Sequence, residues 1–491
     1  MGSTEDTKGP NGTLVDFTTF QNIIDGSLHG STEIHQGINP SNGKPLWDVP
    51  IASADDLNVA VAAAQRAFKT WSKTKWEDRQ EILGKIAAEF GKYQEQMGEL
   101  LMLEGGKPIQ FAKIEAWAAG EGLRYCASEG PFADEVLEDD ENLRLTMRHT
   151  PIGIVGAICP WNFPLAIAMN KIAPALLTGS CIIVKPSPFT PYSVLKFAEI
   201  AQAFLPPGVL QAMNGDAKLG PLMTEHPDIA KISFTGSSAT GKRVMASAAK
   251  TLKRVTLELG GNSASIICPD VDVNKIAPKV ALGAFYNSGQ LCIASKRLYV
   301  HKDIYQDMMK ALIEVVKGWK VGPTSEEGLM LGPVQNEMQH NIVKGFFEDC
   351  ATNGYEFALP GEVGKSDGFV IQPAILDNPP DESKIVREEQ FGPIVPMMKW
   401  DNEAELLARV NDTNTGLGGA VWSSDLEQAQ RIAKQIEAGT IWINNNEMPL
   451  SRAYFSGHKE SGIGGEGGRL GLLAYMNTQV IHMYKSDVGR S

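Results

Sequence analysis

The feature that most constrains the fold is a repeated alternation of short apolar strands and helices between residues 151 and 260. Strands that alternate with helices of this length pair in parallel and are covered by helices on both faces. Ligands of such sheets bind at the carboxyl ends of the strands. The pattern therefore predicts an α/β fold with a ligand site along one sheet edge. The expected strands are 154–158, 181–184, 209–213, 232–234 and 255–259, separated by helices near 166–178, 191–204, 218–225 and 239–252.

A second alternation of strands and helices occupies about residues 261–455. A chain of 491 residues is too long for one simple core. Because no internal repeat or low-complexity linker separates the two alternations, we expect two closely packed α/β units. Helical patterning fills about 54–130, and alternating residues near 135–150 are typical of an exposed hairpin.

The composition argues against several classes of protein. The net charge of −13 disfavours a general affinity for nucleic acid or anionic membranes. The six cysteines and eight histidines are scattered, so neither a disulfide framework nor a metal site is expected. The first fifteen residues lack the apolar core of a secretory signal, and the most apolar stretch, 151–177, is interrupted by Pro160, Pro164 and Pro174. We therefore expect a soluble, cytoplasmic protein without a membrane span.

Two residues far apart in the sequence could supply covalent chemistry. Cys292 ends the run YNSGQLC, and Glu258 lies within LELGG. A thiol is the best nucleophile among side chains, and a carboxylate can serve as a general base. Taken alone, however, a free cysteine is more often a small buried hydrophobe.

Three further patterns suit ligand binding, although each also has a purely structural explanation. PWNFP at 160–164 would fix the side-chain amide of Asn162 where it could donate to an oxyanion, or Asn162 could simply cap the next helix. SFTGSSATG at 233–241 starts a helix, which favours a phosphate, but its spacing matches neither GxGxxG nor a Walker loop. REEQFGP at 387–393 places a carboxylate near an aromatic ring, which suits a ribose and a flat ring but is also typical of a charged loop.

Combined, these patterns resemble the aldehyde dehydrogenase superfamily over about residues 20–485. The resemblance implies a Rossmann-like cofactor domain (residues 1–132 and 152–260), a catalytic α/β domain (261–460) and an oligomerisation element (133–151 and 476–485). It also implies a homodimer or homotetramer. The motifs that carry it occur in the family's order and spacing: PWNFP at 160–164, KPSPFTP at 185–191, SFTGS at 233–237, LELGG at 257–261, GQLC at 289–292, EEQFGP at 388–393 and GHKESG at 457–462.

The resemblance also implies a mechanism. Cys292 would attack an aldehyde carbonyl, Asn162 and the backbone N–H of Cys292 would stabilise the oxyanion, and hydride would pass to a nicotinamide. Glu258 would then activate the water that releases the acid from the thioester. The cofactor, NAD or else NADP, would be bound by Trp161, Lys185, Ser187, Pro188, Gly236, Ser237, Gly241, Glu389 and Phe391.

This chain departs from the family at several positions. Pro188 replaces a glutamate that grips the adenosine ribose in many NAD-dependent relatives. The absence of the glutamate carboxylate removes a repulsion toward the 2′-phosphate of NADP. It also removes hydrogen bonds to NAD. We expect a slight preference for NAD and hypothesise dual specificity. Asn262 replaces a common lysine, a change that the sequence does not explain.

Other departures fall on the substrate tunnel. Asn170 and the loop 445–448 lack aromatic residues frequent in relatives, while Leu291 and Ile293 flank the nucleophile. These residues predict a wider, more polar entrance for a bulky or oxygenated aldehyde, unless the loop varies without consequence.

Three other functions remain open from the sequence. A CoA-acylating aldehyde dehydrogenase would pass the thioester to a thiol, although Glu258 argues against this. A catalytically silent binding protein on the same scaffold is disfavoured because nucleophile, base and oxyanion donor are all present. A Cys–His hydrolase would consume its substrate without a nicotinamide cofactor.

Overall fold

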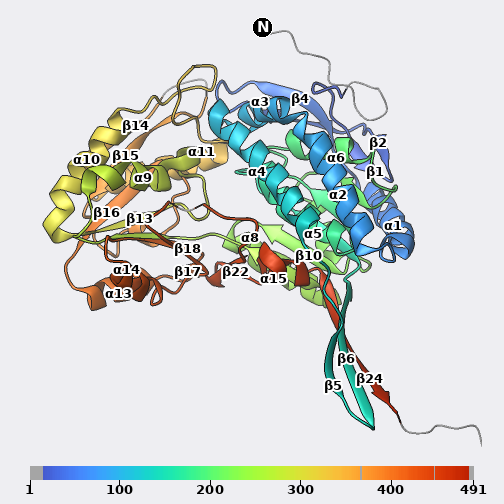
Figure 1. Cartoon of the computed structure of the whole chain (residues 1–491). Helices are drawn as coiled ribbons and strands as arrows, with labels where there is room; N and C mark the ends of the chain where they lie inside the picture. Colours follow the sequence, from blue (N-terminus) through green and yellow to red (C-terminus); the bar gives the residue numbers. More distant parts are fainter. Residues whose placement is uncertain (1–14, 365–367, 447, 486–491) are drawn as a thin grey trace, which may run out of the picture.

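The structure is a computed structural model that describes residues 15–364, 368–446 and 448–485. The expectation about a secretory signal in the first fifteen residues falls almost wholly outside this range, as does Glu447 of the loop 445–448. Figure 1 shows two sheets with their helices and a long hairpin that projects from one side. The α/β class predicted from the strand–helix alternation is confirmed.

The first sheet has eight strands, of which the central five are parallel. β1 and β22 flank these five strands and pair antiparallel with them, and the edge strand β2 pairs antiparallel with β1; β22 comes from the C-terminal part of the chain. In spatial order the strands are β2 (Ser27–His29), β1 (Asn22–Ile24), β9 (Leu210–Ala212), β8 (Cys181–Lys185), β7 (Ile154–Ile158), β10 (Lys231–Thr235), β11 (Arg254–Glu258) and β22 (Gly462–Ile463).

Helices from the first half of the chain cover this sheet and share one hydrophobic core with it. The first helix starts at a capping box, in which Ser53 and Asp56 satisfy each other's backbone N–H groups. The helices are α1 (Ala54–Trp71), α2 (Trp76–Gly91), α3 (Gln94–Gly105), α4 (Ile109–Ser128), α5 (Pro164–Leu177), α6 (Tyr192–Ala201), α7 (Leu219–Glu225), α8 (Ser238–Ala248) and, near the C-terminus, α15 (Gly468–Leu473).

The second sheet has seven strands, and all neighbours pair in parallel except β14 and β15. In spatial order they are β14 (Phe357–Val363), β15 (Ile371–Asp377), β16 (Ile394–Trp400), β13 (Arg297–His301), β12 (Ala264–Ile267), β18 (Gly418–Trp422) and β19 (Thr440–Ile443).

Helices cover both faces of this second sheet. Successive strand residues point to opposite faces, so Ile266 and Ile267 belong to different hydrophobic cores. One core is formed with α9 (Val273–Phe285) and α10 (Tyr305–Lys317); the other is formed with α11 (Glu337–Thr352), α12 (Lys384–Arg387), α13 (Glu403–Asn411) and α14 (Leu426–Ala433).

A three-stranded sheet forms the projecting hairpin (Figure 1). The last strand pairs antiparallel with the middle one over its whole length, although they are more than 300 residues apart in sequence. The strands are β5 (Glu135–Asp139), β6 (Leu143–Pro151) and β24 (Met476–Tyr484). Three two-stranded pieces complete the described strands: β3 (Ile34–Ile38) with β4 (Pro45–Pro50), β17 (Thr415–Gly416) with β21 (His458–Lys459), and β20 (Phe455–Ser456) with β23 (Gly465–Glu466).

Among the described residues no helix is both long and apolar enough to cross a membrane. All six cysteines are free thiols, and only Cys292 is not fully buried.

Candidate active site

Most of the residues predicted to bind cofactor or act as base lie along the carboxyl edge of the first sheet. Strands β8, β7, β10 and β11 are consecutive neighbours, so their carboxyl ends are adjacent. Lys185 ends β8, and Glu258 ends β11. Asn162 lies in the turn after β7, and Gly236 directly follows β10. This edge is where a doubly wound sheet binds its ligands.

The nucleophile loop, residues 286–296, brings Cys292 to this edge from the second sheet. A 3₁₀ turn at Tyr286–Gly289 contains three successive left-handed residues, Asn287 (φ 52°), Ser288 (φ 56°) and Gly289 (φ 73°). A Cβ on Gly289 would lie 2.2 Å from the carbonyl oxygen of Gly392, so the turn packs directly against the 388–393 loop. Left-handed non-glycine residues store strain that the surrounding structure must hold, and here that strain sets the path of the chain into Cys292.

The thiol of Cys292 and the carboxyl of Glu258 lie close enough for each to shift the pKa of the other. Burial, and after it the nearby carboxylate of Glu466, raises the pKa of the Glu258 carboxyl to about 7. Burial also raises the pKa of the Cys292 thiol, with an added contribution from Glu258. Oε1 of Glu258 is buried without a hydrogen-bond partner among the described residues, so it can accept one from a water molecule or a substrate.

The side chain of Asn162 contacts the same loop. Nδ2 of Asn162 donates to the backbone carbonyl oxygen of Gln290 at 3.1 Å. The backbone carbonyl oxygen of Asn162 accepts from Nδ2 of Asn287 at 3.3 Å. An amide nitrogen carries two N–H groups, so one remains for a developing oxyanion. Asn162, Glu258 and Cys292 all line one cavity.

The turn that carries Asn162 is held from another helix. Helix α5 has no side-chain cap of its own at Phe163, and the carboxylate of Glu115 in α4 takes that role by accepting from the backbone N–H groups of Leu165 (3.1 Å) and Ala166 (3.3 Å). Glu115 also forms a fully buried ion pair with Lys107. No local pattern indicated this pair, because both residues lie within the helical patterning of 54–130.

A second buried ion pair, between Lys171 and Glu466, lies near Glu258. It too was not predicted from the sequence. Lys171 additionally donates to Oγ1 of Thr235 at 2.8 Å, and Glu466 accepts from Oγ of Ser233 at 3.2 Å. A signal did exist, because Lys171 is the single charged residue in the otherwise apolar helix α5. Its partner is 295 residues away in sequence, which no local pattern can indicate.

The residues predicted to hold the nicotinamide end of a cofactor also converge here. Oε1 of Glu389 accepts from the backbone N–H of Gly261 at 3.3 Å. The rings of Phe391 and Trp161 meet edge to face at 5.4 Å. Phe391 itself has a left-handed backbone (φ 48°), which turns the 388–393 loop toward Trp161.

The residues predicted for the rest of the cofactor lie farther along the same edge. Ser237 caps helix α8, since its Oγ accepts from the N–H of Thr240, and a helix start of this kind suits a phosphate. A Cβ on Gly241 would come within 2.4 Å of Leu259, so α8 packs closely on the sheet. Burial lowers the pKa of Lys185 to about 8. Oγ of the buried Ser187 accepts from the N–H of Phe189, and the carbonyl oxygen of Pro188 accepts from Nε2 of His35 at 2.8 Å. These residues fit a dinucleotide.

The cavity that reaches Cys292 has a volume of about 210 Å³. Asn170 lines it, but of the loop 445–448 only Met448 does so among the described residues. The polar entrance expected from that loop is thus restricted to Asn170 and Ser451, and most of the wall is apolar: Ile114, Ala118, Phe163, Ala166, Ile167, Leu291, Ile293, Met448, Pro449, Leu450, Ala453 and Phe455.

Within the described residues no group of three or more His, Cys, Asp or Glu side chains could hold a metal ion.

Comparison with known proteins places the chain in a family. The model of the aldehyde dehydrogenase family matches residues 28–481. Aldehyde dehydrogenase LUC3 of Fusarium sp is 40% identical over 96% of this chain and 100% of its own length. Among solved structures, an NAD⁺ complex of aldehyde dehydrogenase from Bacillus cereus superposes with a TM-score of 0.92 at 32% identity, covering 95% of this chain and 97% of that one. A structure described as an E. coli NADP dependent enzyme gives 0.93 at 32% identity, with coverages of 95% and 98%.

The α/β fold and the residues at the carboxyl edge of the first sheet thus define an enzyme of the oxidoreductase class. The chain belongs to the aldehyde dehydrogenase family, whose members oxidise aldehydes.

Proposed function

We propose that the protein oxidises an aldehyde to its carboxylic acid with NAD(P)⁺, through a thioester on Cys292. The observation that carries this proposal is that Cys292, Glu258 and Asn162 line one cavity, with the thiol and the carboxyl close enough to shift each other's pKa. Residues 1–132 with 152–260 would bind the cofactor, 261–460 would supply the nucleophile, and 133–151 with 476–485 would form the contact between subunits.

In this proposal the thiolate of Cys292 attacks the carbonyl carbon, and Asn162 donates to the oxygen on which negative charge develops. A bound nicotinamide, held at Glu389 and Phe391, supplies the acceptor for the hydride that leaves the adduct carbon. Glu258 then takes a proton from water as the water attacks the thioester carbonyl, which releases the acid and restores the thiol.

The apolar wall of the cavity favours an uncharged aldehyde with an apolar tail. Burying a charged group against such a wall without a partner would cost binding energy. Of the three carboxyl groups that line the cavity, Glu115 is paired with Lys107 and Glu466 with Lys171, while Glu258 is the proposed base.

The cofactor preference is open to either dinucleotide. One solved relative is described as binding NAD⁺ and another as NADP dependent, at equal identity to this chain. Pro188 provides neither a carboxylate to grip a ribose nor one to repel a 2′-phosphate, which supports dual use with NAD slightly ahead.

A panel of apolar, oxygenated and cationic aldehydes, assayed for acid with NAD or NADP and with or without CoA, tests the proposal. We expect that acid formation requires a dinucleotide and does not change when CoA is added. It should be fastest with apolar aldehydes and should be lost in Cys292→Ala. Formation of an acyl-CoA, or acid formation without a dinucleotide, would replace the proposal with one of its alternatives. An NAD preference of several thousand-fold would overturn dual specificity alone.

A further inference from the structure

A buried cation, Lys296, ends the nucleophile loop and contacts the 388–393 loop. Its Nζ donates to the carbonyl oxygen of Cys292 and to Oε1 of Glu389, both at 2.7 Å. The Lys296 side chain is only 3% exposed. The ammonium also lies 5.4 Å from the centre of the Phe391 ring, within the range of a cation–π contact. One cation therefore contacts the peptide unit of Cys292 and both residues proposed to hold the nicotinamide nucleoside.

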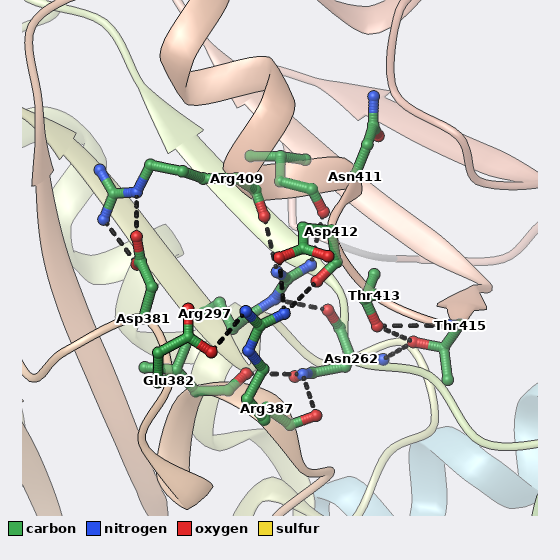
Figure 2. A network of polar contacts seen from close by, with 12 residues as sticks. Asn262, Arg297, Asp381, Glu382, Arg387, Arg409, Asn411, Asp412, Thr413 and Thr415 are labelled. Carbon is green, nitrogen blue, oxygen red and sulfur yellow. Dashed lines mark hydrogen bonds and ion pairs between the residues drawn. The ribbon is translucent and has the colours of Figure 1, made fainter.

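Asn262 connects the two chain segments that carry Lys296 and Glu389, because it hydrogen-bonds to residues close to each of them (Figure 2). The carbonyl oxygen of Asn262 accepts from Nε of Arg297, the residue after Lys296, at 2.9 Å. Its side-chain Nδ2 donates to the carbonyl oxygens of Val386 (2.8 Å) and Arg387 (3.3 Å), which end helix α12 just before Glu389. This provides a physical account of an asparagine at position 262, because its short amide reaches carbonyl groups that the 388–393 loop depends on.

Arg297 is also held by contacts other than the one with Asn262. Its guanidinium is buried and donates to the carbonyl oxygen of Val410 at 3.0 Å. Figure 2 shows Arg387 next to it, held between Glu382 and Asp412 by ion pairs of 2.9 and 2.7 Å. This network thus fixes Arg297, which follows Lys296, and Arg387, which lies two residues before Glu389.

The charges that face the Cys292 thiol are two carboxylates and one ammonium. Burial is the main reason that the pKa of the thiol is raised, and the carboxylates of Glu258 and Glu389 raise it further, whereas Lys296 lowers it. Glu466 and Lys171 in turn act on the carboxyl of Glu258. Lys296 is thus the cation that offsets the charge of Glu389 at the nucleophile.

We propose that Lys296 is a positioning residue that bridges the Cys292 carbonyl and the Glu389 carboxylate, so that nucleophile and ribose-binding group are aligned before the cofactor arrives. Because Lys296 and Gly261 occupy Oε1 of Glu389, the ribose hydroxyls would bind Oε2. Oε2 fills the space beside Gly260, where a Cβ would lie 2.3 Å from it. The inference rests on the proposed function, since it needs Cys292 as nucleophile and Glu389 as a cofactor contact.

The test is the pH profile of Cys292 alkylation by iodoacetamide in the cofactor-free protein, followed by peptide mass analysis. In Lys296→Met the alkylation rate at pH 8 should fall about tenfold, which corresponds to one pKa unit in the thiol. Lys296→Arg, which keeps the charge, should stay within about threefold of wild type on the same scale. Lys296→Met with Glu389→Gln should recover most of the loss, because the carboxylate that Lys296 offsets is gone.

Lys253→Met is the matched control. Lys253 is a buried lysine that also donates to backbone carbonyl oxygens, those of His226 and Ile229, but far from Cys292 in the fold. Its removal should leave the alkylation profile unchanged. An unchanged profile in Lys296→Met, an equal shift in Lys253→Met, or no recovery in the double variant would each overturn the inference.

Turnover measurements separate this inference from the proposed function. Lys296→Met should raise KM for the dinucleotide about tenfold, equivalent to one hydrogen bond to a charged group, while lowering kcat much less. If Cys292→Ser still oxidises aldehyde, the proposed function fails. If Cys292→Ser is inactive but Lys296→Met keeps both the wild-type alkylation profile and the wild-type KM, the role of Lys296 alone fails.

Discussion

Glu258 shares its buried surroundings with the carboxylate of Glu466 and the ammonium of Lys171. Burial and Glu466 together hold the pKa of Glu258 near 7, while Lys171 acts in the opposite direction. A carboxyl group with such a pKa can accept a proton from water near neutral pH and is itself regenerated easily. Burial is thus the main cause of the raised pKa, and Glu466 and Lys171 adjust it in opposite directions.

The rate of thioester hydrolysis should therefore depend on pH. Only the ionised form of Glu258 can take a proton, so the rate should rise through about pH 7 and be lost on the acidic side. Decay of the acyl-enzyme, followed by rapid quench between about pH 5.5 and 8.5, measures it. In Glu466→Gln the midpoint should move to lower pH, because a like charge that raises the pKa of Glu258 has been removed. A flat profile in the wild-type protein would rule out Glu258 as the base.

Single residues differed in how well the sequence could reveal them. Cys292, Glu258 and Asn162 were found through short motifs, and their proximity in the structure agrees with the roles predicted for them, which remain proposals. Lys296 was not found, because its meaning depends on a carboxylate 93 residues away and on a carbonyl oxygen that no motif records.

At the scale of elements, the start of helix α5 shows how one helix is held by another. Glu115 replaces a local cap and neutralises Lys107, whose side chain is completely buried. Removing one partner of a buried ion pair leaves an uncompensated charge, which costs far more than the pair itself contributes.

Glu115→Ala should lower the free energy of unfolding by about 3 kcal/mol, measured as a shift in the denaturant midpoint. Adding Lys107→Met should restore much of the loss, because the unpaired charge disappears although the cap does not return. Glu81→Ala, which breaks the exposed Lys85–Glu81 pair, should leave the midpoint unchanged. Equal effects of Glu115→Ala and Glu81→Ala would show that the buried pair does not hold the turn at Asn162.

Elements were predictable where their pattern was local. The parallel strands β7, β8, β10 and β11 lie within a residue or so of the expected positions. The short strands β1, β12 and β22 were not expected, because two to four residues carry too little pattern and their partners lie elsewhere in the chain.

At the scale of the whole molecule, the two sheets contribute different parts of the site. Glu258 ends a strand of the first sheet, whereas Cys292 arrives on the loop that leads into β13 of the second. The packing of the sheets therefore sets the distance between nucleophile and base. The absence of a linker in the sequence predicted that the two units pack closely, but no local pattern could show which loops would meet.

The projecting hairpin carries exposed apolar side chains, among them Ile481 (43% exposed) and Met483 (49%) on β24. We predict that Ile481→Lys with Met483→Lys lowers the sedimentation coefficient to that of a monomer, because two charges would be buried in the contact between subunits. Gln479→Lys, on the same face of the strand, should leave the assembly intact if its exposed side chain lies at the rim. A wild-type protein that already sediments as a monomer would remove the predicted oligomer altogether.

The central claim is that one thiol carries the acyl group and one carboxylate releases it. It is tested most directly by the mass of Glu258→Gln, quenched in acid after mixing with NAD and an aldehyde that the wild-type protein oxidises. We expect one equivalent of reduced cofactor and an acyl group on Cys292 that is lighter by two hydrogens than the reversible aldehyde adduct. Cys292→Ala should show neither. Steady turnover by Glu258→Gln at the wild-type rate, or an acyl group on another residue, would contradict it.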